Sequence, residues 1–133
     1  MNVPAEAQID LGVVRDNVTG LRKHVGAAEL MSVVKSDAYG HGMIPVAKAA
    51  LAAGAGWLGV IRVEEALALR EAGLTAPVLC LMSVPGGRHE EAIRHDVDLA
   101  AGSAGMVAEL AAAAQRAGRP ARVEAAGASA GAA

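Results

Sequence analysis

The residue with the clearest capacity for chemistry is Lys35, which directly follows the apolar run 30–34. That run contains adjacent β-branched residues and predicts a strand buried on both faces. In parallel α/β proteins, ligands and catalytic groups lie at the carboxyl ends of the strands. An apolar wall there would favour the neutral amine, which can form a Schiff base with a carbonyl group. The alternative is a lysine whose ammonium group extends from the strand end into water, and Lys35 alone favours this alternative.

The residues after Lys35 make its surroundings more specific. Ser36, Asp37 and two glycines predict a loop, and the stretch VVKSDAYGHG resembles the cofactor-lysine signature of the alanine racemases, A-V-V-K-A-N-A-Y-G-H-G. The resemblance extends over about residues 5–123. It implies that Lys35 binds pyridoxal 5'-phosphate (PLP) covalently and that the hydroxyl of Tyr39 binds the cofactor phosphate. Ser36 and Asp37 replace the usual alanine and asparagine, which are small polar changes.

Strand and helix patterns alternate along the chain. Runs of apolar residues predict strands, and apolar residues three and four apart predict helices. The expected strands cover residues 7–11, 30–34, 56–61, 77–82, 97–101 and 121–123. The expected helices cover residues 11–25, 44–53, 64–72, 90–94 and 104–117. This alternation predicts a parallel sheet, either doubly wound or closed as a barrel. The resemblance implies the parallel (β/α)8 PLP-binding barrel of the alanine racemase type, with Lys35 on its first strand.

A complete barrel of this kind needs about 250 residues, so 133 residues would hold only about the first half. A half barrel leaves two strand edges unpaired. We therefore expect a fragment, a truncated product or a chain that must assemble. Residues 1–123 are expected to form the N-terminal part of the barrel, and residues 124–133 an Ala/Gly-rich low-complexity tail. The family continues after this strand with a segment like HLKVDTGMGR, so the simplest account is a truncation or frame change near Glu124.

The activity implied by the resemblance is conversion of L-alanine to D-alanine for peptidoglycan precursors, by a homodimer. Racemisation needs a base on each face of the cofactor. In the family the second base is a tyrosine from the partner subunit's C-terminal domain, but the single tyrosine of this chain is Tyr39. The chain alone is therefore expected to be weakly active or inactive. Two alternatives are a non-catalytic PLP-homeostasis protein and an inactive racemase remnant. The first generally lacks the A-Y-G-H-G continuation.

Composition restricts the class of protein. Hydrophobic residues make up 53% and aromatic residues 2%, so Ala, Val, Leu and Met must form the core. A net charge of −2 gives no basic excess for nucleic acid or anionic membrane. The single cysteine, Cys80, lies in an apolar run and predicts a buried thiol. The chain shows no signal-peptide pattern, and we expect a cytoplasmic protein.

Two apolar residues are secondary candidates for the cofactor site. Val33 and Leu81 match family positions near the cofactor. As apolar strand residues they are expected first in the core and second as a cofactor wall. His41, between two glycines, is expected to make local hydrogen bonds.

The remaining polar groups favour structural roles. His89, His95, Asp96 and Asp98 lack metal-ligand spacing, so we expect solvated surface and no metal site. Glu64 and Glu65 open a helix and suit its dipole. Asp37 is expected to hydrogen-bond within its loop or to cap the next helix, with no catalytic role.

Overall fold

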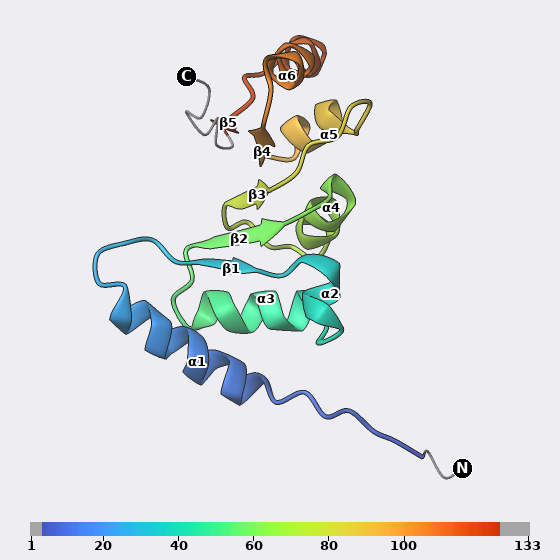
Figure 1. Ribbon diagram of the computed structural model, residues 1–133. Coiled ribbons are helices and arrows are strands. Elements are labelled where there is room, and N and C mark those ends of the chain that lie inside the picture. Colours follow the sequence, from blue (N-terminus) through green and yellow to red (C-terminus); the bar gives the residue numbers. More distant parts are fainter. Residues whose placement is uncertain (1–3, 126–133) are drawn as a thin grey trace, which may run out of the picture.

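The computed structural model describes residues 4–125, which form one parallel sheet with six helices (Figure 1). The strands are β1 (Met31–Val33), β2 (Trp57–Val60), β3 (Val78–Cys80), β4 (Val97–Ala101) and β5 (Val123–Ala125). The helices are α1 (Leu11–His24), α2 (Lys35–Tyr39), α3 (Met43–Ala52), α4 (Val63–Glu71), α5 (His89–Arg94) and α6 (Ala104–Ala117).

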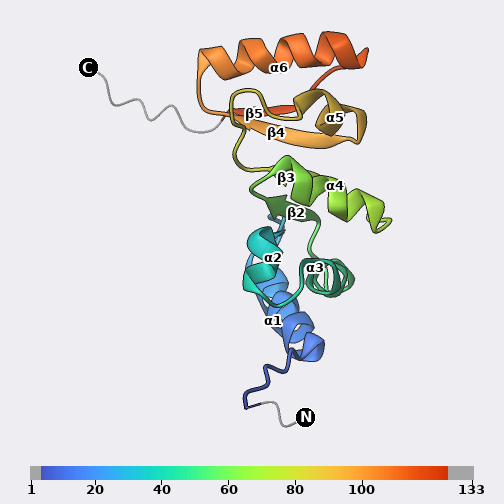
Figure 2. The same cartoon turned by 90° about the vertical axis from the view of Figure 1, so that its right-hand side faces the viewer.

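The strands pair in sequential order, β1-β2-β3-β4-β5, and every pair is parallel. Alternate strand residues such as Leu58, Val60 and Cys80 are fully buried and share one core with residues of α3 to α6. Figure 2 shows these helices along one side of the sheet. A doubly wound sheet would carry helices on both faces and would reverse its strand order. The arrangement is that of a (β/α) barrel wall, opened out over five strands.

The beginning of the chain corrects one prediction. The strand expected over residues 7–11 is absent, and these residues lead into α1 instead. The carboxylate of Asp10 accepts hydrogen bonds from the amides of Gly12 at 2.8 Å and Val13 at 3.2 Å. An aspartate that satisfies the free amides of a first turn starts a helix. No neighbouring strand lies beside residues 7–11 within the described part of the chain to pair with them.

The other end of the sheet differs slightly from the expected division of the chain. Strand β5 includes Glu124 and Ala125, and the rest of the expected low-complexity tail lies outside the described residues. The division at residue 124 stays a prediction.

The single cysteine is buried in the interior, as the apolar run around it predicted. Cys80 is fully buried and is a free thiol whose Sγ lies 3.3 Å from the carbonyl oxygen of Ile61. Burial raises the pKa of this thiol above its ordinary value. Across residues 4–125, none of the helices combines the length and the apolar character needed to cross a bilayer.

Candidate active site

The segment after strand β1 is a left-handed turn. The φ angles of Ser36, Asp37, Ala38 and Tyr39 are 55°, 54°, 52° and 56°. The sequence predicted a loop here; the structure instead has the short helical segment α2, most of which is left-handed. An L-residue in this conformation costs roughly 1–2 kcal/mol, and four in succession are maintained only where the surroundings fix them. Because backbone strain of this kind concentrates at functional sites, the turn is the first candidate site of the fold.

Several bonds within the segment hold the turn. The carboxylate of Asp37 accepts a hydrogen bond from the amide of Met43 at 2.8 Å, at the start of α3. The amide of Ala38 donates to the carbonyl of Val34 at 3.0 Å. His41 Nδ1 lies 2.9 Å from the carbonyl oxygen of Ala38. The local roles predicted for Asp37 and His41 are therefore confirmed.

A further bond to the turn comes from a distant residue, Glu65 of α4. One carboxylate oxygen accepts from the amide of Ser36 at 2.7 Å. The other accepts from the amides of Ile61 and Arg62, each at 3.0 Å. Burial raises the pKa of Glu65, but the bonds from Arg62, Ser36 and Ile61 lower it by more, so its pKa lies below the ordinary value. Glu64 is exposed in the first turn of α4, where the helix-dipole interpretation is sufficient.

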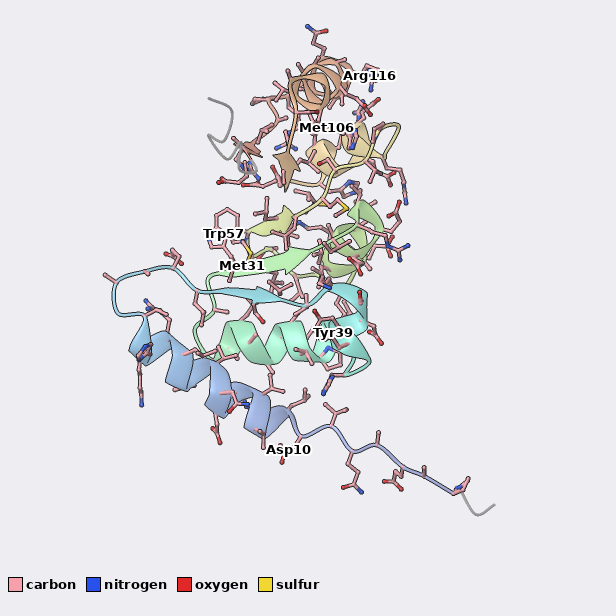
Figure 3. All side chains as sticks on the ribbon, viewed as in Figure 1. Asp10, Met31, Tyr39, Trp57, Met106 and Arg116 are labelled. Atoms are coloured by element: carbon pink, nitrogen blue, oxygen red, sulfur yellow. The ribbon has the colours of Figure 1, made fainter. Side chains whose placement is uncertain are left out.

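The turn brings together the two residues that the motif singled out. The Nζ atom of Lys35 lies 4.7 Å from the centre of the Tyr39 ring. Lys35 is partly buried. The ring of Tyr39 is 74% exposed and projects from α2 at the carboxyl end of the sheet (Figure 3). An amine and a phenol therefore stand at one accessible place on the fold.

The core interpretation of Val33 and Leu81 was wrong. Their side chains are 50% and 36% exposed, whereas the adjacent Val34 is fully buried. Both lie on the sheet face that carries no helix, over Gly59. A Cβ added at Gly59 would be 3.2 Å from Val33 Cγ2 and 3.4 Å from Leu81 Cδ1. Within residues 4–125 nothing covers this face, so an apolar strand residue on it stays accessible.

A separate hollow lies elsewhere on the same face. It measures about 380 Å³ and contains the ion pair between Asp98 and Arg122 at 2.6 Å. Met31 and Trp57 line it at the amino ends of their strands, at the opposite end of the sheet from Tyr39 (Figure 3). Catalytic groups of parallel barrels gather at the carboxyl ends of the strands. We therefore place the candidate site at the turn and not in this hollow.

One histidine also departs from the sequence prediction. His89 was expected at the solvated surface, but it is 2% exposed. Its Nδ1 lies 3.1 Å from a carboxylate oxygen of Glu109, and the amide of Gly86 donates to the same oxygen at 2.7 Å. The His89 side chain is thus enclosed between α5 and α6, which the sequence spacing gave no means of predicting. The structure shows no group of three or more metal-ligating side chains among residues 4–125.

Comparison with known proteins identifies a family over nearly the whole described chain. The family described as "Alanine racemase, N-terminal domain" matches residues 9–125. An alanine racemase of Frankia casuarinae is 56% identical over 117 residues, which are 88% of this chain and 30% of that protein. An alanine racemase of Beutenbergia cavernae is 50% identical over 123 residues, 92% of this chain and 32% of the relative.

Solved structures give the same correspondence. The alanine racemase from D-cycloserine-producing Streptomyces lavendulae superposes with a TM-score of 0.84 at 49% identity, over 86% of this chain and 30% of that one. The alanine racemase from Bacillus anthracis with bound L-Ala-P gives a TM-score of 0.68 at 38% identity, over 79% of this chain and 29% of that one. The expected barrel of the racemase type is confirmed for its first five strands. The chain spans 30–32% of the length of the Frankia and Beutenbergia relatives.

Proposed function

Because the chain belongs to the alanine racemase N-terminal domain family, we propose that it forms the cofactor-binding part of a PLP-dependent alanine racemase. The reaction is interconversion of L- and D-alanine for peptidoglycan precursors. The observation that supports this proposal most directly is the left-handed turn, in which Lys35 and Tyr39 lie together at the carboxyl end of β1. Since the chain spans 30% of the Frankia relative, the activity is proposed for a protein in which the remaining length is also present.

The residues of the turn fit the two reactive ends of PLP. Lys35 offers a primary amine to the aldehyde carbon, and the exposed hydroxyl of Tyr39 offers a hydrogen-bond donor to the phosphate. Val33 and Leu81, half-exposed on the open sheet face, supply apolar surface beside them. Their exposure, which contradicts a purely structural role in the core, is what a cofactor wall requires.

When bound, PLP supplies an electron sink for the charge that develops at the substrate Cα. The role of this chain in the reaction is proton transfer. The amine of Lys35 takes or returns the Cα proton on one face of the substrate. Inversion needs a second base on the opposite face. The sequence holds one tyrosine, Tyr39, which we assign to the phosphate. We therefore propose that the second base comes from outside this chain, in keeping with a homodimer. Cytoplasmic location stays a prediction.

One other candidate is a chain that binds PLP without racemising alanine. The two candidates share the Lys35 site and differ in turnover. Measurements of cofactor attachment and of D-alanine formation therefore separate them.

The first experiment is covalent mapping of the cofactor. The 133-residue chain is mixed with PLP, reduced with borohydride and digested, and the modified lysine is located by mass spectrometry. We expect the adduct on Lys35 and its loss in Lys35→Ala, while Lys48→Ala retains it. An adduct confined to Lys23 or Lys48 would refute the assignment. Alanine racemisation is then assayed with the C-terminal remainder of a relative added.

A further inference from the structure

Glu65 makes a contact that a helix-capping residue does not need. Its carboxylate joins two segments, since it accepts from the amide of Ser36 at 2.7 Å and from those of Ile61 and Arg62 at 3.0 Å. Ile61 and Arg62 follow strand β2, and Ser36 lies just beyond the end of β1, after Val34 and Lys35. The amide of Val34 still donates to the carbonyl of Gly59 at 2.8 Å, as a bond between adjacent strands. The bonds of Glu65 continue the link between the two segments where the sheet pairing stops.

The amide of Ser36 is the group through which this link reaches Lys35. That N–H lies in the planar peptide group that joins Lys35 to Ser36, so fixing its direction fixes the backbone of Lys35 on its carboxyl side. Ser36 is also the first of the four left-handed residues. A charged acceptor at 2.7 Å therefore holds the turn at the point where it leaves the strand.

A purely structural account of Glu65 explains only part of these bonds. Glu65 is the third residue of α4, and its bond to the amide of Arg62 is the ordinary capping-box contact. Capping accounts for a bond within α4 and its preceding residues. It does not account for the bond to Ser36, which lies 29 residues away on another element.

We propose that Glu65 is a positioning residue for the racemase site, which fixes the left-handed turn and thereby the direction of the Lys35 side chain. The inference rests on the proposed attachment of PLP to Lys35. A carboxylate is suited to this role because both oxygens accept hydrogen bonds. A glutamine would place an NH2 group against either Ser36 or the pair Ile61 and Arg62. Aspartate is one methylene shorter and can cap α4 without reaching Ser36.

The test compares Glu65→Gln and Glu65→Asp with a matched control, Glu64→Gln, on the neighbouring exposed carboxylate of the same helix turn. The first readout is amide hydrogen exchange of the 133-residue chain without cofactor. Loss of a bond to a charged acceptor should speed exchange at Ser36 by about tenfold or more in both Glu65 variants. The amide of Leu58, in the adjacent strand, should keep its exchange rate, and Glu64→Gln should leave both amides unchanged.

The second readout is the rate at which PLP forms the borohydride-trapped adduct on Lys35, which should fall about tenfold in Glu65→Asp and stay unchanged in Glu64→Gln. An unprotected Ser36 amide in the unaltered chain overturns the inference. So does an equal adduct rate in Glu65→Asp and the unaltered chain, or a parallel loss of protection at Leu58. If Ser36 responds as expected but no chain forms an adduct on Lys35, the positioning of the turn stands and the proposed function fails.

Discussion

Removal of the Arg70 side chain should test how the wall of the barrel is held together. The guanidinium of Arg70 donates to the carbonyls of Leu74 at 2.8 Å and Ala76 at 2.7 Å, before β3. It also donates to the carbonyls of His95 and Asp96, each at 2.9 Å, before β4. One side chain thus joins the amino ends of two adjacent strands.

The size of the stability loss depends on which of the four carbonyl groups would be left buried without a hydrogen-bond donor. The bonds to Leu74 and Ala76 are partly buried, and a buried acceptor without a donor costs about 1–3 kcal/mol. The bonds to His95 and Asp96 are exposed, so water replaces Arg70 there at little cost. Burial lowers the pKa of the guanidinium, which shows that its own desolvation offsets part of the gain. We expect Arg70→Met to lower the free energy of unfolding by about 2–4 kcal/mol.

The assay is urea unfolding followed by the fluorescence of Trp57, the single tryptophan. The control is Arg88→Met, which removes an exposed pair with Glu91 at 2.6 Å and should cost at most about 0.5 kcal/mol. The dependence on urea concentration should stay the same, because both variants expose the same surface on unfolding. If the two variants differ by less than about 0.5 kcal/mol, the four bonds of Arg70 do not join the strands as inferred.

Three further predictions concern the interior and the turn. Because burial raises the pKa of Cys80, iodoacetamide should label this thiol in urea but not in the folded chain, and rapid native labelling would contradict its burial. Glu109→Ala leaves His89 Nδ1 and the Gly86 amide without their shared acceptor, so the free energy of unfolding should fall by about 1–2 kcal/mol in the same urea assay. Since folding depresses the pKa of Glu65 below 4.5, its ionised form stabilises the fold above that pH, and this stabilisation is lost as the pH falls through the depressed pKa. Thermal unfolding between pH 6 and 3 should therefore show a shallower acid loss in Glu65→Gln; an unchanged acid limb would contradict the depressed pKa.

The local patterns of the sequence determined the alternation of strands and helices and the position of Lys35 at a strand end. Apolar spacing is a property of neighbouring residues, so the bounds of β4 and α6 could be predicted to the residue. The motif around Lys35 and Tyr39 gave the family, because those residues are contiguous. The strand expected at residues 7–11 was wrong because β-pairing needs a partner strand, which local alternation does not supply.

The tertiary structure decided which face of the sheet is covered by helices and which stays accessible. An apolar strand such as that of Val33 predicts burial on both faces, yet the side chain is 50% exposed because helices cover one face alone within residues 4–125. His89 lies against Glu109 of α6, and the first amide of the left-handed turn donates to Glu65, 29 residues beyond Ser36. Spacing along the chain does not give such distances in space. The motif at Lys35 could therefore be recognised in the sequence, whereas the hydrogen bonds that Glu65 accepts from Ser36, Ile61 and Arg62 are visible only in the tertiary structure.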